Sequence, residues 1–275
     1  MAFHAKNFLS GLGRLVSALV VLAYVPCVRA QTDPEPIPEA NPARPTVSNP
    51  ATLTPIGYLQ FENGLLRAKT SPEFSTRLGV GQVTKLTFLP RLQMFVNSEP
   101  LVHSRTGAKK QDRPGEIFAG VQGVLFAGSG AHPTISASYI RRLYVSPAPE
   151  LDIGTFRQSA IILVSGDLSG FHFDANGIVS EQAEEAVRRA QYGQTLSISR
   201  HFSKLTISGE IWHFTQPFLK SNAVGNLWAV SYSVRRNLVL DAGFDHGLTD
   251  TSTRWEAFVG FTYLLPRRLW RQQRH

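Results

Sequence analysis

Apolar and polar residues alternate in short stretches from about Pro55 to Tyr263. The alternation is clearest in residues 171–180, 238–245 and 255–263, where one parity is apolar and the other is polar or small. A period of two residues is typical of β-strands whose two faces meet different surroundings. Together with weaker stretches, the pattern predicts about twelve strands.

The segments between these strands alternate in length. Short turns are predicted near 90–91, 128–133, 169–170, 201–203 and 235–237. Longer polar connections are predicted at 67–80, 100–114, 145–157, 181–190, 215–224 and 246–252. Bacterial outer-membrane barrels have short periplasmic turns, longer external loops and an even number of strands. We therefore predict an all-β, transmembrane antiparallel β-barrel over residues 54–265, with both termini periplasmic.

A soluble β-sandwich would also show alternation, since one face of each of its sheets is solvated. The predicted strands contain few lysines, and their polar parity mixes acidic, amide and hydroxyl residues with glycine, which favours a lumen over a solvated sheet. Aromatic residues that we expect near the membrane interface are Tyr58, Tyr139, Tyr144, Trp212, Trp228, Tyr232, Trp255 and Tyr263. Within 181–190, acidic and basic residues at i,i+4 spacing predict one or two helical turns.

Residues 1–30 have the pattern of a secretory signal peptide. Lys6 and Arg14 precede the apolar run 15–25, and Val28-Arg29-Ala30 supplies small residues for cleavage before Gln31. The run is shorter than the roughly 20 residues that a membrane-spanning helix needs. Lipoprotein processing at Cys27 is a rival interpretation, although the proline before the cysteine fits it poorly. If Cys27 leaves with the leader, the mature chain has no cysteine.

Residues 31–53 contain six prolines among small and polar residues, a composition that favours extended polyproline and cannot bury a core of its own. We predict a disordered periplasmic tether here, and no plug domain. Residues 266–275 form a basic C-terminal tail. Three basic residues of the leader and four of the tail account for most of the formal charge of +8, which leaves about +1 for the rest. Nucleic-acid binding is therefore not expected, and the tail is predicted to contact anionic lipid headgroups or water.

Ten charged or ionisable residues fall on the parity predicted to face the lumen. The candidate lumen-lining residues are Glu62, Lys85, Glu99, Asp167, His172, Asp174, Glu210, Asp241, Asp245 and Glu256. Mixed charges could line a channel and bind polar solutes weakly enough to release them. They could equally form ion pairs and hydrogen bonds that stabilise a narrow barrel, and we favour this role for most of them.

The sequence offers no persuasive catalytic or cofactor site. His172 and Asp174 should share a face, but two ligands on one strand are too few to specify a metal. Outer-membrane phospholipase A, a hydrolase with a twelve-stranded barrel, places its histidine and serine on one face. His103 and Ser104 are adjacent and would point to opposite faces. The motif Gly79-Val80-Gly81 lacks the rest of a dinucleotide fingerprint. We expect no cofactor and no enzymatic activity.

Three stretches resemble outer-membrane proteins of the meta-pathway of phenol degradation family. They are residues 49–64, which enter the first strand, residues 86–100, and the closing strand 255–263. Members are described as transporters of aromatic or other hydrophobic compounds, and the family offers no active-site residues to carry over. In contrast to many outer-membrane barrels, the chain continues past Tyr263 instead of ending on an aromatic residue.

These observations predict a protein of the outer membrane of a Gram-negative-type bacterium. We expect passive passage of small solutes, with aromatic or hydrophobic solutes suggested by the resemblance. The expected partners are the lipid bilayer, the solute and the barrel-assembly machinery. The alternative is a non-conducting barrel that binds a partner through its loops or stabilises the membrane.

Overall fold

The computed structural model describes residues 37–130, 132–149, 151, 156–184 and 187–270. The predicted signal peptide and residues 31–36 of the predicted tether lie outside this part of the chain. The strands in the described part are β1 (Leu59–Lys69), β2 (Thr76–Leu89), β3 (Leu92–Thr106), β4 (Lys109–Arg113), β5 (Ile117–Phe126), β6 (Thr134–Tyr144), β7 (Phe156–Leu168), β8 (Phe171–Glu184), β9 (Val187–Phe202), β10 (Leu205–Gln216), β11 (Ser221–Arg235), β12 (Leu238–Gly247) and β13 (Trp255–Leu264).

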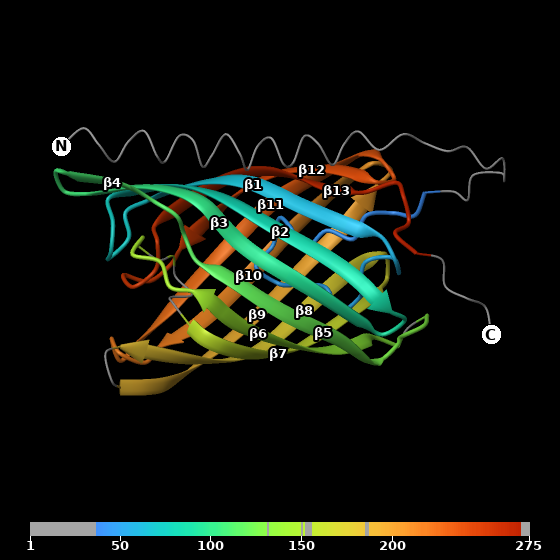
Figure 1. The fold of residues 1–275 in the computed structure, drawn as a ribbon, viewed down its shortest axis with the longest axis horizontal. Helices are drawn as coiled ribbons and strands as arrows, with labels where there is room; N and C mark the ends of the chain where they lie inside the picture. Colours follow the sequence, from blue (N-terminus) through green and yellow to red (C-terminus); the bar gives the residue numbers. More distant parts are fainter. Residues whose placement is uncertain (1–36, 131, 150, 152–155, 185–186, 271–275) are drawn as a thin grey trace. The chain divides into compact units, whose positions relative to one another are not determined.

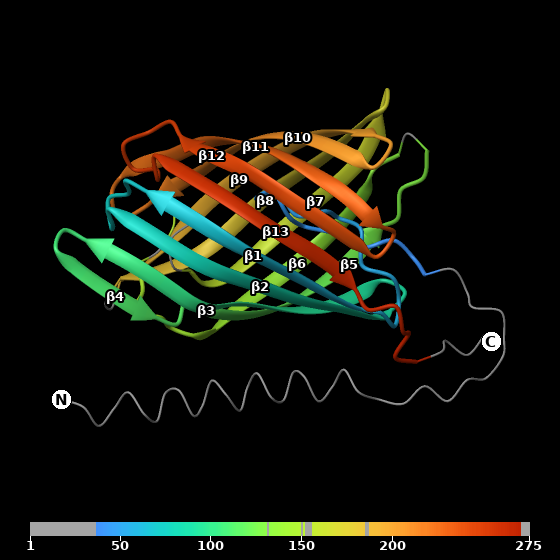
Figure 2. The same cartoon turned by 90° about the horizontal axis from the view of Figure 1, so that it is seen from above.

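Twelve of these strands form a closed antiparallel barrel (Figures 1 and 2). Each strand pairs with its neighbour in the chain, except that β3 pairs with both β4 and β5, and β1 closes the barrel against β13. β4 is a short strand that forms a hairpin with the end of β3 and extends beyond the rim. The predicted all-β barrel of twelve strands is confirmed. Among the described residues, no helix is long and apolar enough to cross a membrane.

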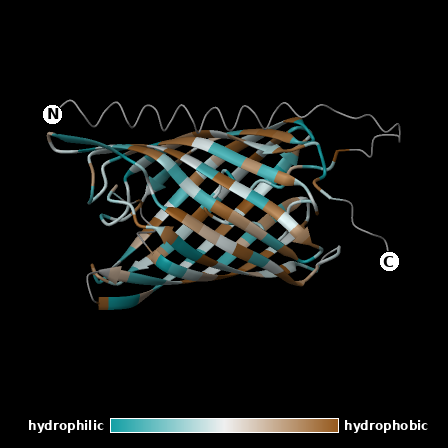
Figure 3. Cartoon of the chain, viewed as in Figure 1, coloured by the Kyte–Doolittle hydropathy of each residue, from teal (hydrophilic) through white to brown (hydrophobic). Residues whose placement is uncertain are grey.

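The two faces of the wall have opposite character, as the alternation predicted. Large apolar side chains on the outer face are exposed, such as Ile211 at 54% and Val259 at 53%. Polar side chains on the inner face are buried, such as Ser208 at 5% and Thr262 at 0%. The resulting checkerboard of hydropathy covers the strands in Figure 3. Because lipid can accept only apolar groups, this inverted arrangement is that of a membrane barrel.

The predicted helical turns within 181–190 are wrong for the residues described there. β8 continues to Glu184 and β9 begins at Val187. Arg188 instead lies opposite Ala183 across the two strands, and its Nε is 3.4 Å from Glu181 Oε1. Opposite charges across a strand pair stabilise a sheet as i,i+4 pairs stabilise a helix, so the same composition satisfies both structures.

The aromatic residues divide between the two faces. Trp228, Tyr232 and Trp255 are exposed on the outer face. Trp212 instead points inward and is only 3% exposed, and its Nε1 donates a 2.7 Å hydrogen bond to Asp245 Oδ2. Its ring lies against Gly225 of the next strand, where a Cβ atom would be 2.1 Å from the ring. The missing side chain at Gly225 is therefore what allows this indole to lie inside.

Candidate functional site: the barrel lumen and the segment inside it

Residues 37–55 run from the rim into the barrel and back, and we refer to them as the lumenal segment. The segment passes the β11–β12 turn, where Ala40 N donates to Arg236 O at 2.8 Å, and it returns to the same end before β1. In Figure 1 its blue trace enters the barrel from one end. Ser48 and Ala51 are fully buried. The prediction of a disordered tether is therefore wrong for residues 37–53.

The first part of the segment is held by β1 and β12. Gln60 forms two hydrogen bonds with the backbone of Asn41, of 2.8 and 2.7 Å. The Glu62 carboxylate accepts from Ala43 N at 3.2 Å. Arg44 forms a 3.2 Å ion pair with Asp241, and its guanidinium covers Gly64 and Gly260, where a Cβ atom would clash with it. Glycine at these two wall positions thus makes room for an arginine that lies across the lumen.

Glu210 of β10 holds the middle of the segment. Its carboxylate accepts hydrogen bonds from Val47 N at 2.7 Å, Ser48 N at 2.7 Å and Ser48 Oγ at 2.6 Å. Ser48 Oγ also contacts Thr195 Oγ1 of β9 at 2.7 Å. Hydrogen bonds to an ionised carboxylate are stronger than those between neutral groups. Glu210 therefore holds this part of the segment through three hydrogen bonds.

The segment then continues along the neighbouring strands β8, β7 and β6. Asn176 of β8 accepts from Asn49 N at 2.7 Å and donates to Asn49 O at 2.9 Å. Ala51 N donates to Ser165 Oγ of β7 at 2.6 Å, while Ala51 O accepts from Ser136 Oγ of β6 at 2.5 Å. In this way the backbone polar groups of a segment without secondary structure are satisfied by side chains of the wall, as buried polar groups require.

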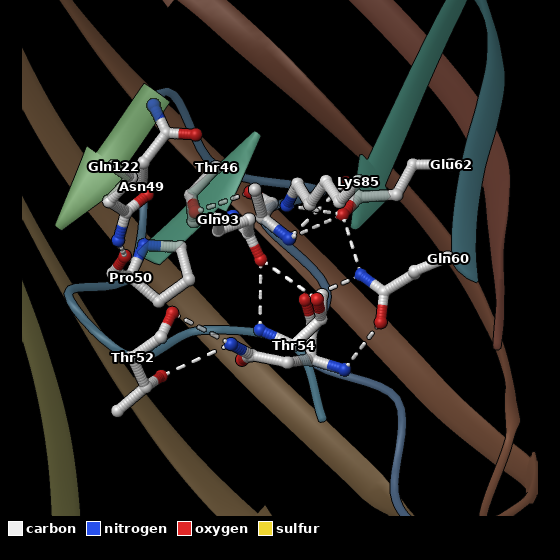
Figure 4. A network of polar contacts seen from close by, with 12 residues as sticks. Thr46, Asn49, Pro50, Thr52, Thr54, Gln60, Glu62, Lys85, Gln93 and Gln122 are labelled. Carbon is white, nitrogen blue, oxygen red and sulfur yellow. Dashed lines mark hydrogen bonds and ion pairs between the residues drawn. The ribbon is translucent and has the colours of Figure 1, made fainter. Parts of the chain in front are cut away.

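The last part returns along β2, β3 and β5. Gln122 donates to Pro50 O at 3.0 Å, and Gln93 accepts from Thr54 N at 2.9 Å. Asn41 Nδ2 donates to Thr52 O at 2.9 Å, which ties the entering part of the segment to the returning part. Figure 4 shows this network, in which amide and hydroxyl side chains of the wall point toward the backbone of the segment.

Every strand of the closed barrel contributes a contact to the lumenal segment. β11 and β13 do so through apolar side chains, since Val47 packs against Leu227, Ala229 and Phe258. The other ten strands contribute the ion pairs and hydrogen bonds of Gln60, Thr87, Gln93, Gln122, Ser136, Ser165, Asn176, Thr195, Glu210 and Asp241. A segment anchored around the whole circumference narrows the lumen on every side.

Five of the ten predicted lumen-lining residues are buried, namely Glu62, Lys85, Glu210, Asp241 and Asp245. Glu62 pairs with Lys85 at 2.5 Å, and Asp245 accepts from Trp212. Glu62, Glu210 and Asp241 hold the lumenal segment. These contacts support the structural role that we favoured, with one difference. Three of the carboxylates bind a segment of the N-terminal region, whereas we had expected barrel residues to pair among themselves.

The other five are less buried. At the end with the short turns, His172 Nδ1 is 2.8 Å from Asp167 and its Nε2 is 3.4 Å from Asp174. Asp174 accepts from Ser165 at 2.5 Å, which links this cluster to the lumenal segment. At the other end, Glu99 pairs with Arg77 at 2.6 Å and Glu256 lines a cavity. No group of three or more residues suited to a metal ion occurs in the described part of the chain.

The neutral residues that hold the lumenal segment were not among the predicted lumen-lining residues, which are all charged or ionisable. They are Gln60, Thr87, Gln93, Gln122, Ser136, Ser165, Asn176 and Thr195. Each lies on the inward parity of its strand, so the alternation was a usable signal. Their partners could not be predicted, because they are backbone and hydroxyl groups of a segment that shows no alternation.

Between the lumenal segment and the longer connections lies a cavity of about 360 Å³, which we call the upper cavity. Its apolar wall includes Phe95 and the ring pair Phe118 and Phe156, whose centroids are 4.6 Å apart. Arg44 and Arg77 also line it. Arg77 is 3% exposed, and its Nη1 has no hydrogen-bond partner among the described residues. Arg44 and Arg77 therefore have N–H groups that can donate hydrogen bonds to a solute.

A second cavity of about 200 Å³ adjoins the same segment and is lined by Trp212, Phe214 and Phe258. It shares Arg44, Leu66 and Leu151 with the upper cavity. Aromatic and aliphatic walls with a few polar groups are usual in sites for small organic molecules.

Comparison with solved structures supports the architecture. An outer membrane channel from Pseudomonas putida F1 matches with a TM-score of 0.58 and 11% identity, covering 86% of this chain and all of that one. The NanC porin matches with a TM-score of 0.54 and 9% identity, covering 75% of this chain and all of that one. The fold is that of an outer-membrane β-barrel. Its apolar outer face accordingly lies in the lipid of an outer membrane.

Sequence comparison adds nothing to this result. No protein-family model and no curated protein matches the chain. The resemblance to the phenol degradation family therefore stays a prediction, and the structural neighbours, at these identities, establish the fold alone.

Proposed function

We propose that the protein is an outer-membrane channel for small solutes, with its termini in the periplasm and the lumenal segment as its constriction. The observation that carries this proposal is the pair of cavities between the segment and the longer connections. A barrel whose lumen served only for stability would gain from filling this space, since empty volume in a protein interior is destabilising. The two structural neighbours, a channel and a porin, agree with passage and not with catalysis.

The lining of the upper cavity supports a solute that combines an aromatic ring with a hydrogen-bond acceptor. Phe95, Phe118 and Phe156 offer rings against which an aromatic solute can stack. Arg44 and Arg77 offer guanidinium donors. Planar guanidinium groups bind carboxylates well, so we propose small aromatic acids as the class to test first.

We expect aromatic acids to interrupt the current through the refolded mature protein in a planar bilayer. Benzoate should block at lower concentration than benzyl alcohol, which lacks the charge, and cyclohexanecarboxylate, which lacks the ring. Arg77→Met should weaken benzoate blockade roughly ten-fold or more, because a charge-assisted hydrogen bond contributes about 1.5–3 kcal/mol. The control is Arg91→Met, which removes an exposed arginine from the turn at the other end. Equal blockade in both variants would contradict the assignment of this solute class.

A non-conducting barrel is the second candidate. It is favoured by the contacts of the lumenal segment with all twelve strands, which describe a filled lumen as well as a narrow one. A correctly folded protein that never conducts, with the segment present or removed, would decide for this alternative.

A further inference from the structure

The outer face of β1 to β4 carries a row of basic side chains at the end of the barrel with the longer connections. The registers place Trp255 beside Lys69, Lys69 beside Thr76, Thr76 beside Arg105, and Arg105 beside Lys110. Directly paired residues in an antiparallel sheet point to the same face. We call Arg67, Lys69, Arg105 and Lys110 the basic row.

The position of the basic row is set by the residues below it on the same face. Lys69 lies at the outermost level of β1. Arg67, which pairs with Leu78, is two residues further into the barrel, and Leu65, which pairs with Val80, is two residues beyond Arg67. Leu65, Leu101 and Val259 are about half exposed, as lipid-facing side chains should be. Trp255 at the level of Lys69 is a residue type that prefers the membrane interface. The basic row therefore lies at the height of lipid headgroups.

The row brings four positive charges together on one face. No ion pair with these four side chains occurs in the described part of the chain. Asp112, the acidic residue at this level, is 2.6 Å from His103. Arg105 and Lys110 are directly opposite each other. Like charges in that arrangement destabilise a strand pair, so an anion between them would relieve a repulsion.

We propose that the basic row binds the headgroup of a lipid that carries more than one phosphate, such as a diphosphorylated glycolipid of the outer leaflet. The row extends over β1 to β4, and neighbouring strands are about 4.8 Å apart, which gives a width of roughly 14 Å. One phosphate diester cannot contact cations over that width, whereas a headgroup with two separated phosphates can. The apolar residues below the row provide a surface for the acyl chains of the same lipid.

The hairpin of β3 and β4 supplies a matched pair of variants. Arg105 and Lys110 belong to the row, whereas Lys109 and Arg113 lie on the opposite face of the same hairpin and are also exposed. The double variants Arg105→Ala with Lys110→Ala, and Lys109→Ala with Arg113→Ala, remove the same charge from the same element. Arg67→Ala with Lys69→Ala tests the row on β1, independently of the hairpin.

The experiment titrates the mature protein, held in nanodiscs of neutral phosphatidylcholine, with diphosphoryl lipid A, monophosphoryl lipid A, phosphatidylglycerol or inorganic phosphate, and counts bound lipid by native mass spectrometry. We expect diphosphoryl lipid A to bind most tightly, and less tightly as salt is raised. Both row variants should weaken it by about ten-fold or more, while the control variant changes it by less than about two-fold.

Three results would overturn the proposal. The first is an equal effect of the row and control variants, which would indicate general attraction to a basic hairpin. The second is equally tight binding of phosphatidylglycerol, and the third is saturation by inorganic phosphate at the same affinity. Folding of each variant is checked by the shift of the unheated barrel on gel electrophoresis. Because the binding is measured on the outer face, its failure would leave the proposed channel function untouched.

Discussion

Deleting residues 37–53 should convert the barrel into an open pore whose single-channel conductance is several-fold above that of the intact protein. The segment contacts every strand of the wall, so its removal clears the lumen across its whole width. Strand number sets the diameter of a barrel, and the twelve strands close through their own ladder without help from the segment. We therefore expect the deleted protein to fold and to conduct.

Planar-bilayer recordings of the two proteins, prepared in the same detergent, measure this change. Far-ultraviolet circular dichroism and the mobility of unheated protein on a gel control for folding. A folded deletion variant with the conductance of the intact protein would contradict the assignment of residues 37–53 as the constriction.

Glu210→Ala should release the middle of the lumenal segment while leaving the barrel closed. The change removes the acceptor of two backbone N–H groups and one hydroxyl. Each buried donor left without a partner costs about 1–3 kcal/mol. The cost falls on the bound position of the segment, because the Glu210 side chain takes no part in the backbone ladder between β9, β10 and β11. We expect brief openings that are at least about ten-fold more frequent than in the intact protein.

The matched control is Asp167→Ala, an acidic residue on the inward parity whose side chain is 77% exposed and which bonds His172. It should leave the frequency of openings unchanged. If Glu210→Ala opened as rarely as the intact protein, the hydrogen bonds of Glu210 would not be what holds the segment in place.

The barrel could be predicted from the sequence because its physical cause is local. Lipid on one side and a polar lumen on the other impose a period of two, and residues such as Phe244 and Asp245 show it without knowledge of any partner. The inward parity of Glu62, Glu210 and Asp241 followed from the same pattern.

The lumenal segment could not be predicted in the same way, because its order depends on distant residues. A proline-rich segment cannot bury a core of its own, and that reasoning suggested disorder. Here the wall supplies the partners: Val47 N and Ser48 N find Glu210 more than 160 positions away in the chain. Likewise Trp212 looked like an interfacial residue, and it lies inside because Gly225 on the next strand leaves room for its ring.

A reversible cross-link tests whether the lumenal segment lies in the barrel and controls passage. Ser48 Oγ and Thr195 Oγ1 are 2.7 Å apart, so cysteines at both positions should be close enough to form a disulfide. Ser48→Cys alone is the control. When Glu210→Ala is added to the double-cysteine variant, we predict no extra openings while the disulfide is oxidised. Reduction during the same recording should restore the extra openings. Failure to cross-link in the folded protein, or openings indifferent to oxidation, would contradict the account.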